Sequence, residues 1–151
     1  MFFSNEKTKA LRLLDELGLP TDRSTWWVKY PKRALEEILR MQESTNAQLN
    51  CHNEKLVWDE WLLTNFNTQY HIFIETPGFP FKAPRVLVKS PIIKPWRRIH
   101  MYDDGRLCLM HPNKYHSRTS ILEMRNLAAS WCFCHEVFKH TGKWPSDEHP
   151  H

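Results

Sequence analysis

No stretch of this sequence approaches the run of about 18 apolar residues that a membrane-spanning helix requires. We also expect no secretory signal peptide, because Ser4, Asn5 and Glu6 interrupt the short apolar start. The chain contains no internal repeat and no low-complexity segment. We therefore expect a cytoplasmic protein with no membrane partner.

Cysteine is scarce and positive charge is only in small excess. The formal net charge is +4, and the sequence holds four cysteines. A nucleic-acid-binding protein usually carries a denser basic patch than the scattered cations of this chain, so we expect no nucleic-acid partner. In a reducing cytoplasm the four thiols are expected to stay free. A chain of 151 residues, 41% of them hydrophobic, can bury a core without disulfides.

Helical patterns occur near both ends of the chain. Spacing of apolar residues predicts a helix over residues 5–17, and Gly18 suits its end. Pro31 suits the first turn of a second helix. The motif Ser120-Ile121-Leu122-Glu123 matches a capping box, and Gly142 can end the helix that follows it.

Alternating patterns fill the middle of the chain. The predicted strands cover residues 48–53, 56–63, 70–74 and 86–88. Trp58, Trp61 and Trp131 fall at spacings that favour packing in a core. The order predicts an α+β fold in which an antiparallel strand meander is flanked by helices. We divide the chain into an N-terminal helix and connection, residues 1–30, and one domain, residues 31–151.

Residues 92–117 show little periodicity, and Cys108 lies among them. A structureless stretch of this length inside a compact domain is uncommon and often functional. The turn-forming run Asp104-Gly105-Arg106 leads directly into the thiol. Cysteine attacks as the thiolate, which Arg98 and Arg106 favour and which Asp103 and Asp104 oppose. From these residues alone, Cys108 is either a nucleophile or a small buried apolar residue.

Two segments in order resemble those of ubiquitin-conjugating enzymes. The run 78–88, with Pro80 and Pro84, is similar to their proline-containing strand entry. The run Gly105-Arg106-Leu107-Cys108-Leu109 resembles their Gly-x-Ile-Cys-Leu active-site segment. The likeness covers about residues 31–140. The tail, residues 141–151, resembles that of bacterial members that belong to CBASS anti-phage operons.

The resemblance implies a ubiquitin-conjugating-like fold with an active-site loop between the last strand and a C-terminal helix. It also implies that Cys108 forms a thioester with the C-terminus of a modifier protein and passes it to an acceptor amine. In CBASS the modifier implied is a cGAS-like nucleotidyltransferase, and an activating enzyme is a further implied partner. The alternative is a non-catalytic binding module of the same fold, acting as an adaptor or scaffold.

The chain departs from its relatives upstream of the thiol. They carry His-Pro-Asn there, with the Asn about eight residues before the Cys, where this chain has His100. His100 is therefore expected either to donate a hydrogen bond to the oxyanion or to support the loop. The motif His111-Pro112-Asn113 follows Cys108 and predicts only a local turn. His116 is a further candidate, as a base or as a residue that orients the amine.

A zinc site is the third hypothesis. Cys132 and Cys134 are followed by His135, His140, His149 and His151. On a helix the two cysteines project about 200° apart, which disfavours a shared site. A structural zinc site needs four ligands, so we expect no metal and no other cofactor.

Overall fold

The computed structural model describes residues 2–145. The elements are α1 (Phe2–Glu16), α2 (Trp26–Lys29), α3 (Pro31–Ser44), β1 (Gln48–His52), β2 (Lys55–Leu63), β3 (Gln69–Glu75), β4 (Arg85–Ser90), the short 3-10 helices η1 (Arg97–Ile99) and η2 (Pro112–Lys114), and α4 (Ile121–Thr141). The predicted α+β order is confirmed. Residues 146–151 of the tail, with His149 and His151, lie outside the described residues.

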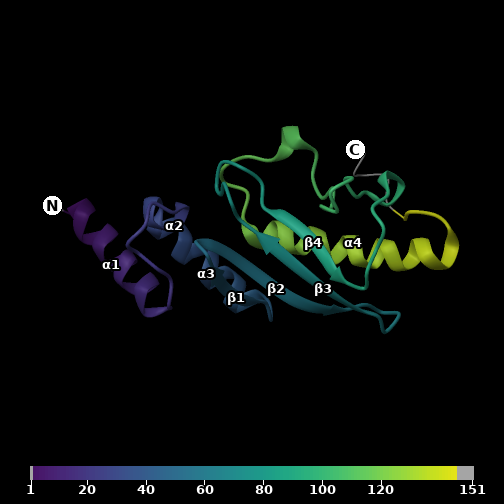
Figure 1. Cartoon of the computed structure of the whole chain (residues 1–151), viewed down its shortest axis with the longest axis horizontal. Helices are drawn as coiled ribbons and strands as arrows, with labels where there is room; N and C mark the ends of the chain where they lie inside the picture. Colours follow the sequence, from purple (N-terminus) through teal and green to yellow (C-terminus); the bar gives the residue numbers. More distant parts are fainter. Residues whose placement is uncertain (1, 146–151) are drawn as a thin grey trace.

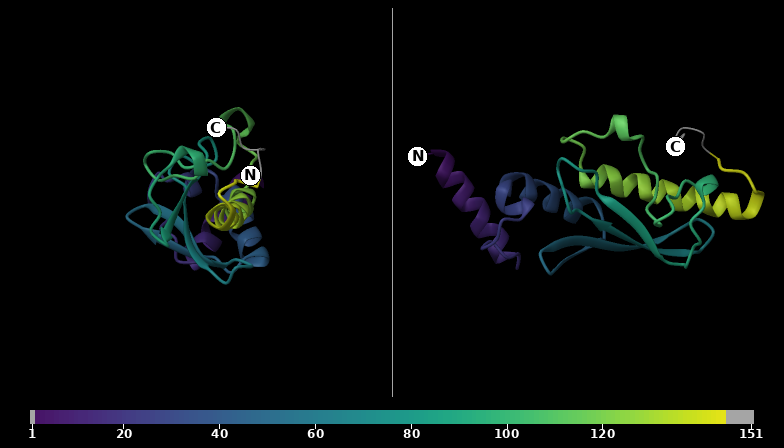
Figure 2. Two further views of the ribbon diagram at one scale, coloured as in Figure 1. Left: turned by 90° about the vertical axis from the view of Figure 1, so that its right-hand side faces the viewer. Right: turned by 45° about the horizontal axis from the view of Figure 1, so that its top comes forward.

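The four strands form one antiparallel sheet in the order β1-β2-β3-β4. This confirms the meander. One face is buried through alternate residues of β2 and β3, and α4 runs along that face (Figures 1 and 2). The buried residues of these strands are Leu56, Trp58, Glu60, Tyr70, Ile72 and Ile74.

The prediction that Trp61 packs in the core is wrong. Its side chain is 54% exposed on the outer face of β2, where it stacks on His71 with ring centroids 4.3 Å apart. Trp58 and Trp131 are buried as expected. Trp61 therefore stabilises a cross-strand aromatic pair instead of the core.

The N-terminal helices extend the core beyond the sheet. α1 packs against α3 and buries Leu14, and Leu19 of the following connection joins the same cluster. Trp27 of α2 is buried too, and its indole N–H donates to the carbonyl of Pro20 at 2.8 Å. In Figure 1 these helices lie at one end of the molecule, away from the last turn of α4.

Both ends of α4 follow from local sequence. The Ser120 hydroxyl accepts from the Glu123 amide at 3.0 Å, and the Glu123 carboxylate accepts from the Ser120 amide at 3.3 Å. Gly142 ends the helix with φ 75, in the left-handed region. These caps set where α4 begins and ends, and so which of its residues face the segment between β4 and α4.

Two buried carboxylates tie α4 to the rest of the domain. Glu37 of α3 accepts from the Ile121 amide at 2.8 Å while pairing with Arg33 and Arg40. Glu60 of β2 binds Arg125 of α4 through two contacts of 2.8 Å. Buried charges are tolerated when they are paired and hydrogen-bonded in this way.

The segment between β4 and α4 doubles back along α4 (Figure 2). Several hydrogen bonds hold it, and two of them lie near the thiol. The Leu107 amide donates to the carbonyl of Val86 at 2.9 Å, and the Trp131 indole N–H donates to the carbonyl of Ile99 at 2.8 Å. The predicted irregular stretch is therefore ordered against the sheet edge and α4.

Among the helices of residues 2–145, none has the length and apolarity needed to cross a bilayer.

Candidate active site

A tight turn presents Cys108. The Gly105 amide donates to the carbonyl of Tyr102 at 2.9 Å, and the Tyr102 amide donates to the carbonyl of Arg106 at 2.8 Å. Gly105 has φ 91, and no atom lies within 4 Å of the position a Cβ would take. The glycine is therefore needed for its backbone conformation and not for space.

The backbone places His100 beside Cys108. The Cys108 amide donates to the carbonyl of His100 at 2.8 Å. His100 has φ 58 and is the residue that ends η1, so the chain reverses at this point. The structure thus brings together the predicted thiol and the residue at the position of the missing Asn.

Both residues line a cavity of about 660 Å³. Its other wall is the side of α4 that carries Ser130 and Cys134, together with Trp144 after the helix. The remaining lining is apolar, from Leu109, Leu127, Ala129, Trp131, Phe133 and Pro145. A concave, mostly apolar site with a few polar groups is typical of ligand binding.

The thiol itself is covered, with Cys108 only 4% exposed. Burial raises its pKa above the ordinary value of 9.0, while a hydrogen bond from the Tyr102 hydroxyl and the charges of Arg97 and Arg106 act in the opposite direction. That Arg98 favours the thiolate stays a prediction, and its guanidinium lies over the rings of Trp96 and Phe138.

Replacing Tyr102 with phenylalanine is expected to slow alkylation of Cys108 at neutral pH by about tenfold. The change removes a hydrogen bond to the thiolate, worth about 1.5 kcal/mol or more, and raises the pKa of Cys108 further. It keeps the ring beneath Arg97 and Arg106. Iodoacetamide rates at Cys108, measured by peptide mapping from pH 7 to 10, test this. A profile identical to that of the unchanged protein would contradict it.

The other histidine candidates lie elsewhere. His116 is exposed, accepts from the Arg118 amide at 3.2 Å, and is not among the residues that line the cavity. Its role as a base stays a prediction. In His111-Pro112-Asn113 the His111 ring accepts from the Asn113 amide at 3.1 Å, which confirms the local turn as η2.

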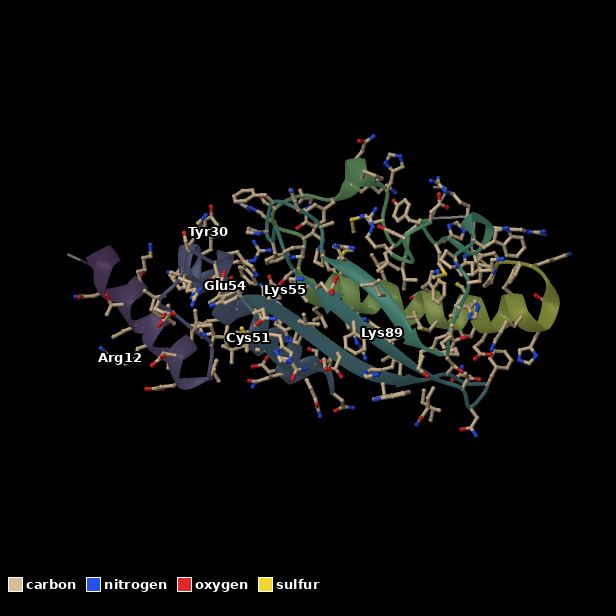
Figure 3. All side chains as sticks on the ribbon, viewed as in Figure 1. Arg12, Tyr30, Cys51, Glu54, Lys55 and Lys89 are labelled. Carbon is tan, nitrogen blue, oxygen red and sulfur yellow. The ribbon has the colours of Figure 1, made fainter. Side chains whose placement is uncertain are left out.

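The cysteines of the zinc hypothesis diverge. Cys132 is buried, and burial raises its pKa to about 12, whereas Cys134 faces the cavity. Cys51 lies on β1, toward the end of the molecule that carries α1 (Figure 3). Within the described part of the chain, no three His, Cys, Asp or Glu side chains are grouped as metal ligands.

A buried histidine lies behind the cavity wall. His135 stacks on Trp131 with centroids 5.0 Å apart, and its Nδ1 is 2.6 Å from the Tyr70 hydroxyl. Burial lowers the pKa of His135, nearby Lys139 lowers it further, and Glu136 opposes them. The neutral imidazole is therefore the form that the fold stabilises.

We expect His135 to make stability fall in mild acid. Its folded pKa is below the ordinary value of 6.5, so its contribution is intact above pH 6.5 and is lost as pH falls below it, by at most about 1.4 kcal/mol per pH unit. Urea unfolding at pH 7.5, 6.5 and 5.5 measures the slope. The free energy of unfolding of His135→Gln should change less with pH over this range than that of the unchanged protein. Equal slopes would contradict the assignment of the acid sensitivity to His135.

The comparisons with known proteins bear on this site. A family model described as "Type II CBASS E2 protein" matches residues 37–151. The chain belongs to this family. None of the curated proteins and none of the solved structures compared with the chain gives a match. As a Type II CBASS E2 protein, the chain has a conjugation-related role in anti-phage defence. The matched region includes Cys108, His100 and all of α4.

Sequence reasoning missed two residues of the site. The sequence pattern assigns Trp144 only to the tail, whereas its ring lies 4.9 Å from that of His100. The pattern suggests Cys134 only as a zinc ligand, whereas it shares a cavity with Cys108. Both positions depend on how the end of α4 packs, and no local pattern reports that.

Proposed function

We propose that Cys108 accepts the C-terminus of a modifier protein as a thioester and passes it to an acceptor amine. The observation that carries the proposal is the shared cavity, in which Cys108 lies beside His100 in a chain of the Type II CBASS E2 family. By this account the modifier is a cGAS-like nucleotidyltransferase of a CBASS operon, delivered by an activating enzyme in the cytoplasm.

The strand meander, the loop that follows β4 and the helix after it support a ubiquitin-conjugating-like fold. In that arrangement the loop presents the thiol at the edge of the sheet. The side of α4 that lines the cavity then packs against the acyl group.

The chemistry needs no cofactor. The Cys108 thiolate attacks the carbonyl of an activated acyl group, the activating thiol leaves, and a C–S bond forms. An uncharged amine then attacks the same carbonyl, the C–S bond breaks to release the Cys108 thiolate, and an amide bond forms as the amine nitrogen passes its proton to water. Positioning of the amine supplies much of the rate because thiolate is a good leaving group. His100 supports the loop or the oxyanion, and His116 is proposed to orient the amine.

One observation favours the second candidate, a non-catalytic adaptor of the same fold. Cys108 is 4% exposed and burial raises its pKa, and both features lower the reactivity of the resting thiol. An adaptor would bind its partner equally well without the thiol. The two functions therefore differ in whether Cys108 is needed after binding.

Co-expression with a cGAS-like nucleotidyltransferase and an activating enzyme from a CBASS operon distinguishes the transferase from the adaptor. Transfer predicts a covalent adduct that migrates above the free chain on a non-reducing gel and disappears with reductant. In Cys108→Ser the adduct should resist reductant, because an oxyester replaces the thioester. If both the unchanged protein and Cys108→Ser co-purified stably with the modifier and neither formed a covalent species, the adaptor function would be favoured.

A further inference from the structure

One tryptophan of residues 2–145 has a buried indole nitrogen for which those residues supply no hydrogen-bond acceptor. The indole N–H groups of Trp26, Trp27 and Trp131 donate to Thr76, Pro20 and Ile99 respectively, at 2.8–3.1 Å. Trp144 is half-buried, and its indole nitrogen is covered but has no hydrogen-bond partner among the described residues. An unmade hydrogen bond of a buried donor costs about 1–3 kcal/mol, so its retention calls for an explanation.

Trp144 lies at the thiol's cavity. Its ring is 4.9 Å from that of His100 and 5.9 Å from that of Trp131, measured between centroids. It lines the same cavity as Cys108 and follows the end of α4 by only a few residues. Ring contacts hold it in place, including one with Phe138, and none of residues 2–145 accepts a hydrogen bond from its indole.

The chain has no Asn at the position from which its relatives are expected to stabilise the oxyanion, and it has His100 there instead. We propose that the Trp144 indole N–H donates a hydrogen bond to the carbonyl oxygen of the acyl group attached to Cys108. The ligand of this donor is an acyl carbonyl at the C-terminus of a peptide. The inference rests on the proposed thioester function.

The step balances without any other reagent than the acyl thioester. When the Cys108 thiolate attacks the carbonyl carbon, the C=O electron pair moves onto oxygen, and Trp144 donates to that oxygen. The pair then returns, the C–S bond to the departing thiol breaks, and that thiolate takes a proton from water. A donor aimed at the oxygen lowers the barrier most at the intermediate, where the negative charge is greatest.

Both the Cys108 thiol and the Trp144 indole N–H are covered in the resting protein, and one displacement of the chain can expose both. Cys108 is 4% exposed and the Trp144 nitrogen is covered, so an acyl group reaches neither in the resting protein. Trp144 and Pro145 form the part of the cavity wall that lies beyond Gly142, outside any helix or strand. Displacement of this short segment opens the thiol and frees the indole N–H together.

The test compares two reactions at Cys108. Acylation by the mercaptoethanesulfonate thioester of N-acetylglycine passes through an oxyanion, whereas alkylation by iodoacetamide does not. Trp144→Phe keeps an aromatic ring but removes the N–H, and is expected to slow acylation about 100-fold while changing alkylation less than about twofold. Trp144→His, which supplies a ring N–H, should recover part of the rate. Trp61→Phe, on the outer face of the sheet, is the matched control and should change neither rate. Peptide mapping reads both rates at Cys108.

Thermal unfolding of each variant shows that it folds, and Trp144→Phe should be at least as stable as the unchanged protein because an unpaired buried donor is removed. If Trp144→Phe changed acylation and alkylation equally, Trp144 would only shape the cavity, and the donor role would be overturned. Unchanged acylation in Trp144→Phe would overturn it as well. If the unchanged protein is alkylated but never acylated at Cys108, the proposed function itself fails, which is a separate outcome.

Discussion

Cys108→Ala is expected to abolish conjugation, reducing covalent transfer of the modifier to background, while leaving the domain folded. No other group can replace a nucleophile that must form and release a covalent bond. The change removes one buried sulfur and should cost about 1 kcal/mol of stability, because the side chain is small and the cavity it leaves is small. Quantitative non-reducing gels with modifier and activating enzyme measure transfer, and urea unfolding measures stability.

Cys134→Ala is the matched control for this variant. Cys134 lines the same cavity, is likewise a free thiol, and is not proposed to carry the acyl group. It should retain transfer within about threefold, a change of less than about 0.7 kcal/mol in the barrier. If Cys108→Ala kept full transfer and Cys134→Ala lost it, the nucleophile would be assigned to the wrong residue.

Glu37→Ala is expected to lower the free energy of unfolding by about 3 kcal/mol, the largest stability effect we expect of any single substitution discussed for this chain. The carboxylate is fully buried and accepts from Arg33, Arg40 and the amide of Ile121. Its removal leaves that buried amide without its acceptor, separates two cations from their counterion, and opens a cavity at the start of α4.

Glu36→Ala tests whether the loss of stability comes from the buried position of the Glu37 carboxylate or only from its charge. Glu36 is exposed on the same helix, so its loss should change stability by less than about 0.5 kcal/mol. Urea unfolding of both variants at pH 7.5 measures the difference. Equal effects would mean that the Glu37 network adds nothing beyond the loss of one negative charge from α3.

Local rules predicted the elements that rest on local chemistry. The Ser120 capping box and Gly142 defined α4 because each acts within a few residues of the helix end. Alternation located β2, but it did not reveal the buried face, since Trp58 on one side and Trp61 on the other are equally apolar. The buried face was decided by where α4 packs, which is a property of the whole fold.

Some features of the candidate site follow from local sequence, and others depend on the whole fold. The turn at Gly105 and the thiol after it could be predicted, because a glycine in a polar run indicates a left-handed residue. Pairing of Cys108 with His100 depends on a left-handed histidine, a conformation that few residues other than glycine adopt. The charge of Arg97 acts on the thiol, whereas the guanidinium of the adjacent Arg98 lies over the Trp96 ring, and the sequence alone does not distinguish the two. Trp144 enters the site only through aromatic packing at the end of α4.

The measurement that tests the account most directly is peptide mapping of Cys108 in protein purified with a CBASS nucleotidyltransferase and its activating enzyme. We expect the peptide containing Cys108 to carry the modifier's C-terminal residues through a bond that hydroxylamine cleaves. An unmodified Cys108 peptide, in a preparation where the modifier is joined to acceptors by this chain, would contradict it.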